Sequence, residues 1–409
     1  MTQKEYSKFI WIGPLATNVS VRMLEISKRL IKDNIFPIIL TQKKERGNNF
    51  RFSNLGKIPP SLKIYYSLSF DYNQKFNYYI KENLLKLCLL FERTPLHLTS
   101  KVRKILKTNK NVKFIYTTGP PFITHIMGYL LKKKLKIPLV VEYTDPWSFN
   151  PYKQELNRLF ENKIDSLVEK KILQYSDIIA SNSSYLNSLL KSNFPSIKHK
   201  QFIAIEDGLN IRQSAIIPKE KTRNIIITYT GSIYGRRNIV PLLKILSELK
   251  KENFFKNIKP LIKIYGKYPK DRLERIINKL GISDLFFLGG FIRRTEVLNE
   301  IKKCDLALHI GESLDYPTIA FKVWDYISYG KKILFITRED TYRASFIKNN
   351  DLGIIIPIDN LPKGKEIFKN LINNIIKNNF SLNIDKNKLD TFTWENRAIK
   401  FIKNVIAKF

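Results

Sequence analysis

The strongest constraint on the fold is an alternation that runs along the whole chain: short apolar runs are separated by longer amphipathic segments. Strands that alternate with helices are typical of parallel sheets covered by helices. The predicted strands are residues 8–12, 36–40, 62–66, 114–116, 139–143, 177–180, 202–205, 225–229, 261–265, 285–288, 306–310, 332–335 and 353–356. The pattern therefore predicts an α/β fold.

The length of 409 residues exceeds what one ordinary hydrophobic core holds, so we expect two domains. Residues 206–212 (E-D-G-L-N-I-R) have turn chemistry, and a polar, charged stretch follows them. We predict two α/β domains with parallel sheets, at residues 1–212 and 213–391. Residues 392–409 form an amphipathic pattern and are expected to be a helix, which could pack back on the first domain, although the periodicity does not say which domain it meets.

The charge is strongly basic, with 71 Lys and Arg against 36 Asp and Glu. Three explanations stay open: compositional drift toward Lys, Ile and Asn, contact with an anionic membrane surface, and nucleic-acid binding. The two cysteines and four histidines show no metal-ligand spacing, so no metal site is predicted. There is no signal-peptide pattern and no membrane-length apolar run, which favours a cytoplasmic protein, with contact at the inner face of the membrane left open.

Residues 315–332 (D-Y-P-T-I-A-F-K-V-W-D-Y-I-S-Y-G-K-K) have helical periodicity with one apolar and one polar face. The polar face holds Thr318, Lys322 and Asp325. Pro317 suits a first turn and Asp315 suits a cap. Such a helix can bind a sugar nucleotide, with its amides and Lys322 on the diphosphate and Asp325 on ribose hydroxyls. A solvated amphipathic helix is the alternative.

Three loops of the first half follow predicted strands, where open parallel sheets bind ligands. Gly13 allows close backbone approach before a helix, but the loop lacks G-x-G-x-x-G, and a plain turn is the alternative. His125 follows the stiff sequence T-G-P-P-F and is expected to point into the cleft; a histidine without chemistry is the alternative. Asp145 ends a strand and suits a base or an acceptor ligand, or else a turn cap.

The second half has a stronger signal at the end of its first strand. There Gly231, Ser232, Arg236 and Arg237 combine a flexible backbone with cations that bind diphosphate, although solvated arginines are the alternative. Gly266 ends the next strand.

A further strand of this half ends in G-G-F-I. Phe291 or Ile292 is expected to lie against a nucleotide base, with core packing as the alternative. Thr295 is expected to cap the helix that follows.

Taken together, the motifs T-G-P-P-F-I-T-H, Y-T-D-P-W, S-D-I-I-A-S-N, Y-T-G-S-I-Y-G-R-R and P-T-I-A-F-K-V-W-D-Y-I-S-Y-G-K-K resemble, in this order, those of GT-B fold glycosyltransferases of the retaining family 4. The resemblance covers nearly the whole chain. It implies two Rossmann-like domains with parallel sheets facing across a cleft, with the helix of residues 392–409 packing back on the first domain. It also implies a UDP- or GDP-linked sugar donor in the second domain, an acceptor in the first, and retention without a metal or other cofactor.

The resemblance assigns roles to some residues and departs from the family at others. The second acidic position of the family's E-x7-E motif matches Asp325, but the first falls on Pro317, and Asp315 or Glu312 is left as a substitute. The paired cations correspond to Lys322 and to Arg237 or Arg236. Asp145 or His125 takes the place of the family's catalytic-side histidine.

The predicted function is transfer of a sugar to a glycan or lipid-linked acceptor in cell-surface polysaccharide synthesis. Membrane contact would use the basic, apolar segments 96–107 and 127–137, which also suit packed helices. The alternatives are a sugar-nucleotide epimerase on the same fold and a basic protein that binds nucleic acid.

Overall fold

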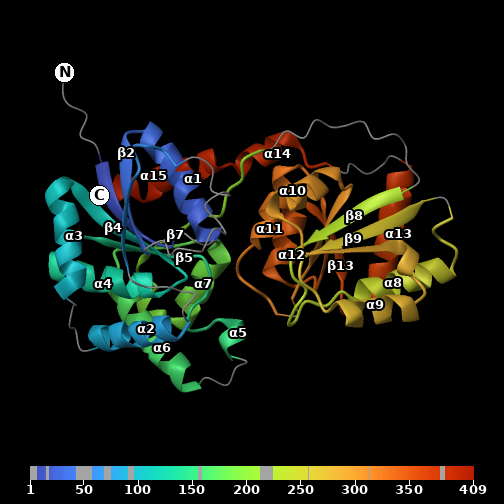
Figure 1. Cartoon of the computed structure of the whole chain (residues 1–409), viewed down its shortest axis with the longest axis horizontal. Helices are drawn as coiled ribbons and strands as arrows, with labels where there is room; N and C mark the ends of the chain where they lie inside the picture. Colours follow the sequence, from blue (N-terminus) through green and yellow to red (C-terminus); the bar gives the residue numbers. More distant parts are fainter. Residues whose placement is uncertain are drawn as a thin grey trace. The chain divides into compact units, whose positions relative to one another are not determined.

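The computed structural model describes residues 7–14, 18–42, 58–68, 75–90, 96–154, 159–211, 224–256, 258–312, 314–377 and 383–409 (Figure 1). It divides into two compact units. Unit 1 comprises Met1–Gly208 and Trp394–Phe409, and unit 2 comprises Leu209–Thr393. The chain therefore leaves unit 1 after Gly208 and returns to it at Trp394.

Unit 1 has a parallel seven-stranded sheet in the order β3-β2-β1-β4-β5-β6-β7. Its strands are β1 Ser7–Ile12, β2 Ile35–Gln42, β3 Lys63–Leu68, β4 Val112–Gly119, β5 Leu139–Tyr143, β6 Ile178–Ser181 and β7 Gln201–Ala204. Its helices are α1 Asn18–Lys32, α2 Lys75–Leu90, α3 Leu96–Thr108, α4 Ile123–Leu135, α5 Pro151–Gln154, α6 Leu159–Tyr175, α7 Ser184–Asn193 and α15 Trp394–Asn404, with short 3₁₀ helices η2 Pro195–Ile197 and η4 Ile406–Lys408.

Unit 2 has a parallel six-stranded sheet in the order β10-β9-β8-β11-β12-β13. Its strands are β8 Asn224–Thr230, β9 Lys259–Tyr265, β10 Phe286–Gly290, β11 Leu306–Ile310, β12 Ile333–Thr337 and β13 Gly353–Pro357. Its helices are α8 Val240–Lys251, α9 Lys270–Lys279, α10 Arg294–Lys303, α11 Phe321–Ser328, α12 Tyr342–Asn349, α13 Leu361–Ile376 and α14 Lys386–Thr391, with η3 Ser283–Leu285.

Every strand predicted from the alternation is present, and the differences are confined to strand ends. In both units the first strand lies inside the sheet, and the order in which strands are added reverses beside it, which is the doubly wound Rossmann order. The predicted α/β class with two Rossmann-like domains is confirmed.

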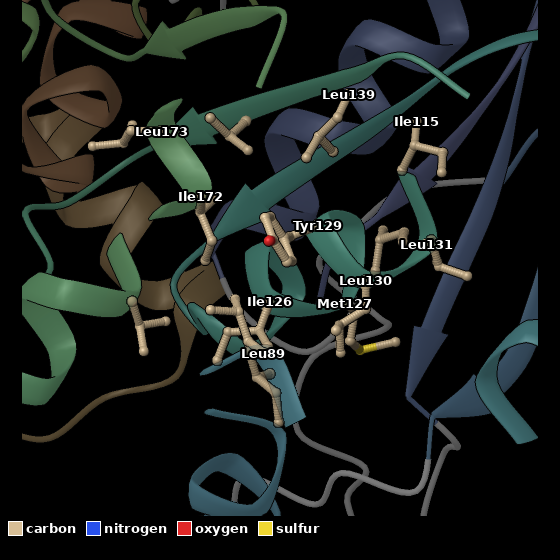
Figure 2. Packing of buried hydrophobic residues seen from close by; sticks show 14 of the residues in the cluster. Leu89, Ile115, Ile126, Met127, Tyr129, Leu130, Leu131, Leu139, Ile172 and Leu173 are labelled. Carbon is tan, nitrogen blue, oxygen red and sulfur yellow. The ribbon is translucent and has the colours of Figure 1, made fainter. Parts of the chain in front are cut away.

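The sheet of unit 1 is covered on both faces. Leu130, Leu131 and their neighbours on α4 are wholly buried against β4 and β5, with Ile172 of α6 and Leu89 of α2 beside them (Figure 2). Each such leucine contributes about 1.5–3 kcal/mol by leaving water. The first half of segment 127–137 is thus a packed helix, the alternative stated for it, and its buried residues are not available for membrane contact. No helix of the described ranges is both long and apolar enough to cross a membrane.

The opposite face of this sheet is covered by α1 together with α15, which joins the amino- and carboxyl-terminal parts of the chain (Figure 1). Phe401 of α15 stacks on Trp11 of β1 with ring centroids 5.7 Å apart. Phe409 stacks on Phe114 of β4 at 4.7 Å. The periodic pattern of residues 392–409 therefore folds as α15 and η4, packed on unit 1.

Unit 2 repeats this layering. Its sheet has α8, α9 and α13 on one face. On the other face, Val323, Trp324 and Ile327 of α11 pack in a second core cluster with residues of α10, α12 and α14. These three are among the apolar positions expected from the helical pattern, so α11 is anchored through the predicted face and its remaining positions are left near the carboxyl ends of the strands.

Candidate functional site

The loops that follow β8 and β11 meet where the strand order of unit 2 reverses. A short antiparallel bridge joins Arg237, in the loop after β8, to Glu312, which follows β11. Ligands of doubly wound sheets bind at this kind of switch point, outside the carboxyl ends of the strands. The loop after β8 is therefore the starting point for the site.

Two glycines let the backbone of adjacent loops come close there. Gly231 has φ of +125° and Gly266 has φ of +130°, a region that side chains disfavour. The Gly231 N–H donates to the Tyr265 carbonyl at 2.8 Å. A Cβ atom on Gly266 would lie 2.2 Å from the Gly231 carbonyl oxygen, and one on Gly231 would lie 2.9 Å from Lys322 Nζ. Both loops therefore require glycine to pack against each other and against Lys322.

Lys322 belongs to the first turn of α11 and its ammonium group is held by an aromatic partner. Nζ donates to the Tyr229 hydroxyl at 2.8 Å and lies 4.1 Å from the centre of that ring. Burial lowers the pKa of Lys322 well below its usual value, and the nearby Arg237 and Arg343 lower it further, while Glu312 opposes them. An anion beside Nζ would reverse this shift.

Two arginines complete a cationic cluster around one carboxylate. Arg237 Nη2 donates to Glu312 Oε1 at 3.1 Å, and its Nη1 donates to the Ser232 carbonyl at 2.9 Å. Arg343 of α12 lies 3.7 Å from the same Glu312 oxygen and donates through Nε to the Thr318 carbonyl at 2.6 Å. Three cations thus share a single carboxylate, which leaves the cluster positively charged.

His309 on β11 lies close to this cluster and was not singled out from the sequence. It is 1% exposed, it stacks on Phe335 at 4.5 Å, and neither ring nitrogen has a hydrogen-bond partner among the described residues. Burial lowers its pKa well below the usual value, and Lys322, Arg343 and Arg237 add to the effect. The ring is therefore neutral.

The start of α11 differs from the expectation. The helix begins at Phe321, so Pro317 is not in its first turn. Asp315 does not cap it either, because its carboxylate accepts from the Tyr342 N–H at the start of α12, 2.8 Å away. The loop before α11 follows a different path because Arg343 binds the Thr318 carbonyl. Thr318 itself is buried.

Asp325 lies on α11 as expected, but it has a partner that the sequence did not indicate. Its Oδ1 accepts a hydrogen bond from Arg294 Nη2 of α10. The carboxylate is 7% exposed, so its charge is compensated within the protein. Any contact with a ribose would have to share the carboxylate with Arg294.

The end of β10 presents an exposed aromatic ring. Phe291 is 67% exposed, so the alternative of core packing is wrong, and Ile292 is half-buried. The Gly266 N–H donates to the Gly290 carbonyl at 2.7 Å, which joins this turn to the glycine-rich loops. The helix after it is capped two residues earlier than expected: the Glu296 side chain accepts from the Arg293 N–H, and Thr295 is inside the helix.

Ser232 and Arg236 lie in the loop after β8 with Arg237. The Ser232 carbonyl accepts from both the Tyr229 hydroxyl and Arg237, each at 2.9 Å. These two hydrogen bonds hold the loop after β8 in place and orient Arg237. Arg236 is half-buried.

In unit 1, the three predicted loop residues differ in their surroundings. The Gly13 N–H donates to the Leu40 carbonyl at 3.3 Å and a Cβ there would lie 2.5 Å from Met23 Sδ; residues 15–17 of its loop lie outside the described residues. Asp145 is half-buried after β5.

The expectation for His125 is wrong. The residue is fully buried in unit 1, where Nδ1 lies 2.8 Å from the Thr117 hydroxyl and the ring lies 4.7 Å from that of Tyr143. Burial lowers the pKa of His125 to about 3. A neutral ring without exposed area cannot reach an acceptor, because the turn after β4 directs the histidine inward.

Sequence reasoning missed Arg343 and His309, and treated Glu312 only as a substitute. Arg343 comes from a helix after the next strand, and no local pattern connects it to the loop after β8. The sequence did contain a signal for His309, because it is a polar residue inside the apolar run L-A-L-H-I. Within the described ranges, no three His, Cys, Asp or Glu side chains lie together in a way that could hold a metal ion.

Comparisons with known proteins bear on the fold. No protein-family model matches the sequence. No curated protein matches it either. Solved structures do: a glycosyltransferase from Rickettsia africae has a TM-score of 0.60 at 15% identity, covering 98% of this chain and 94% of that one.

Two further structures have similar scores. Sucrose-phosphate synthase from Thermosynechococcus elongatus has a TM-score of 0.66 at 14% identity, covering 98% of this chain and 100% of that one. UDP-GlcNAc 2-epimerase from Neisseria meningitidis, solved with UDP-GlcNAc, has a TM-score of 0.60 at 14% identity, with coverage of 98% and 100%. At these identities the likenesses establish the fold, which is GT-B.

Proposed function

We propose that this chain is a glycosyltransferase that moves a sugar from a UDP- or GDP-linked donor to a glycan or lipid-linked acceptor. The observation that carries the proposal is the cationic cluster of unit 2: Lys322, Arg237 and Arg343 share one carboxylate at the switch point of the sheet. A diphosphate supplies the negative charge that this cluster lacks. The GT-B fold of the solved glycosyltransferases supports the same assignment.

In this proposal the donor binds through groups that follow the strands of unit 2. Lys322 and Arg237 bind the diphosphate, together with Arg236, Ser232 and the backbone at Gly231 and Gly266. The first turn of α11, which Thr318 precedes, directs free amides toward the same charge. Asp325 takes a ribose hydroxyl while it keeps Arg294, and the base lies against Phe291 and Ile292.

The proposed chemistry is departure of the diphosphate with retention at the sugar carbon and without a metal. As the sugar–phosphate bond breaks, negative charge grows on the diphosphate, and fixed cations stabilise that charge more than they stabilise the ground state. A diphosphate beside Lys322 raises the pKa of its ammonium group back toward the usual value and so favours the charged form. The acceptor hydroxyl attacks from the face that the leaving group quits, and Asp145 is proposed to orient it; His125 is excluded by its burial.

The acceptor class and the cellular location are part of the proposal. A cytoplasmic enzyme of polysaccharide synthesis would meet lipid-linked acceptors at the inner face of a membrane. Lys101, Arg103, Lys104 and Lys107 of α3 are exposed, and each cation near an anionic surface adds about 1 kcal/mol of binding. Sedimentation with vesicles of neutral and anionic lipid tests this contact.

The direct test is a thermal-shift screen of UDP, GDP and their sugars, followed by a transfer assay with the donor that binds. We expect one nucleotide to raise the melting temperature and its sugar to be released or transferred. The variant Arg237→Ala should lose the shift, whereas Arg272→Ala, on α9, should keep it. No shift with any nucleotide would reject the proposal.

An epimerase is the second candidate, favoured by the likeness to UDP-GlcNAc 2-epimerase. The two reactions differ in their need for an acceptor. An epimerase converts its sugar nucleotide in the absence of any acceptor, and a transferase in that condition gives at most slow donor hydrolysis. Product analysis without acceptor therefore separates them.

A further inference from the structure

Unit 1 contains a hollow at the amino edge of its sheet, the edge opposite to the loops described above. It has a volume of about 350 Å³ and is lined by the first residues of β1, β2 and β3 and by the turn before β4. This size falls at the lower end of the range for small-molecule sites, roughly 300–1,000 Å³. The proposed function uses none of these residues.

The register of the strands explains how the hollow is built. Lys8 of β1 is paired with Phe36 of β2, and Ile38, two residues further on β2, is paired with Lys63 of β3. Residues in register point to the same face of a sheet, as do alternate residues of one strand. The two lysines therefore flank an apolar floor on β2, on strands about 10 Å apart.

The polar wall is preorganised around Lys63. Its Nζ donates to Asn109 Oδ1 at 2.9 Å. Asn109 is buried, and its Nδ2 donates to the Ile105 carbonyl at 2.9 Å and to the Tyr65 hydroxyl at 3.2 Å, which fixes the orientation of its amide. Asn34 and Ser61 add further hydrogen-bonding groups to the lining.

The hollow has no counter-charge within the part of the chain that the structure describes. None of the described residues that line it is acidic, and neither Lys8 nor Lys63 forms an ion pair with another of them. Lys63 has a neutral amide as its partner, so the ammonium charge is oriented without being neutralised. Two cations beside an apolar floor suit an anion that carries an apolar body.

We propose that this hollow is a binding site for a small organic phosphate, with the phosphate between Lys8 and Lys63 and the apolar part on Phe36 and Ile38. The ligand is a free small molecule and is distinct from the nucleotide sugar bound by unit 2. The inference does not depend on the proposed function, because it uses only residues of unit 1.

The test is calorimetric titration of the full chain with phenyl phosphate, inorganic phosphate and phenol. We expect phenyl phosphate to bind, inorganic phosphate to bind at least about threefold more weakly, and phenol not to bind. The double variant Lys8→Gln/Lys63→Gln should weaken phenyl phosphate binding at least about tenfold. The matched control Lys101→Gln/Lys104→Gln removes the same charge from exposed positions of α3 and should change the affinity less than about twofold.

Three results would overturn the proposal: no heat with phenyl phosphate up to about 10 mM, equal affinity for inorganic phosphate, or equal weakening by both double variants. Thermal unfolding of each variant with and without the nucleotide that binds unit 2 checks that both units are folded. An unchanged nucleotide shift in Lys8→Gln/Lys63→Gln keeps this test separate from that of the proposed function.

Discussion

The two units bury cations in opposite ways. In unit 1, Arg22 of α1 is 1% exposed and binds two carboxylates, with Nη2 2.6 Å from Glu142 and Nη1 3.1 Å from Asp207. In unit 2, Lys322, Arg237 and Arg343 share Glu312 alone, and Lys322 donates to a phenol. The first group has its counter-charges built in, and the second has fewer than it needs.

This difference separates a structural ion network from a binding site. The guanidinium of Arg22 also donates to the carbonyls of Ile205 and Glu206, at 2.6 and 2.9 Å, in the segment through which the chain leaves unit 1. All its donors are used within the fold. The cluster of unit 2 keeps a positive excess, and burial together with the neighbouring Arg237 and Arg343 lowers the pKa of Lys322.

The largest effect is expected for Arg22→Met. It leaves Glu142 and part of Asp207 buried without a counter-charge, so the free energy of unfolding should fall by about 3–5 kcal/mol. Urea unfolding followed by tryptophan fluorescence measures the loss. The control Lys28→Met removes a partly exposed cation of α1 that pairs with Glu25 and should cost less than about 1 kcal/mol. Equal losses in both variants would contradict a structural role for the buried network.

For Lys322→Met, the expected effect is on binding rather than on stability. Loss of a desolvated cation from a diphosphate site should weaken nucleotide binding at least about 30-fold, roughly 2 kcal/mol. Stability should stay equal or rise, since no described residue forms an ion pair with its ammonium group and Glu312 acts on it only through space, against the two arginines and burial. Calorimetry and thermal unfolding measure the two quantities. The control is Lys302→Met, which removes an exposed lysine of α10. If Lys322→Met lost as much stability as Arg22→Met, the distinction between a structural ion network in unit 1 and a binding cluster in unit 2 would be contradicted.

Much of the fold and part of the candidate site could be predicted from the sequence. The strands and helices follow from the periodicity of apolar residues, and the site lies in the loops at the ends of strands. Apolar runs located every strand, and the glycines after β8 and β9 marked where backbones approach. Both signals are local. The residues that adjust the charge of the site are not local: Arg294 pairs with Asp325 and Arg343 approaches Glu312 from other helices.

The prediction that His125 points into the cleft was wrong for a related physical reason. A strand-end loop predicts that a residue lies near the edge of the sheet, but not whether its side chain points outward. The turn after β4 places Phe122 flat on Trp147, with ring centroids 4.9 Å apart, and the histidine follows them into the core. Hydrogen bonding to Thr117 and packing on Tyr143 then hold it there.

The buried histidines extend the comparison, since His125 has a hydrogen-bond partner and His309 has none within the described part of the chain. Burial lowers the pKa of His125 to about 3, against an ordinary value of 6.5. Between these values the unfolded chain holds a proton that the folded chain lacks, so stability falls as pH decreases, by up to about 1.4 kcal/mol per pH unit. His125→Gln removes this term.

Relative to the wild type, His125→Gln should therefore lose roughly 2 kcal/mol less stability between pH 7 and pH 5. Urea unfolding at both pH values measures the difference. His199→Gln, on an exposed turn, is the control and should behave like the wild type. An acid response of His125→Gln equal to that of the wild type would show that the ring of His125 takes up its proton in the folded protein.

The smallest effect is expected at β10, the edge strand of unit 2, where one exposed phenylalanine in the strand can be compared with another just after it. Phe291 and Phe287 are 67% and 50% exposed, but only Phe291 follows the carboxyl end of β10 beside the glycine-rich loops. Stacking of a base on one aromatic ring contributes about 1 kcal/mol, so Phe291→Ala should weaken nucleotide binding about three- to tenfold while Phe287→Ala leaves it unchanged. Calorimetry with the nucleotide measures both. Equal nucleotide affinities in the two variants would contradict stacking of the base on Phe291. The cationic cluster would then bind the diphosphate while the base lies on another surface.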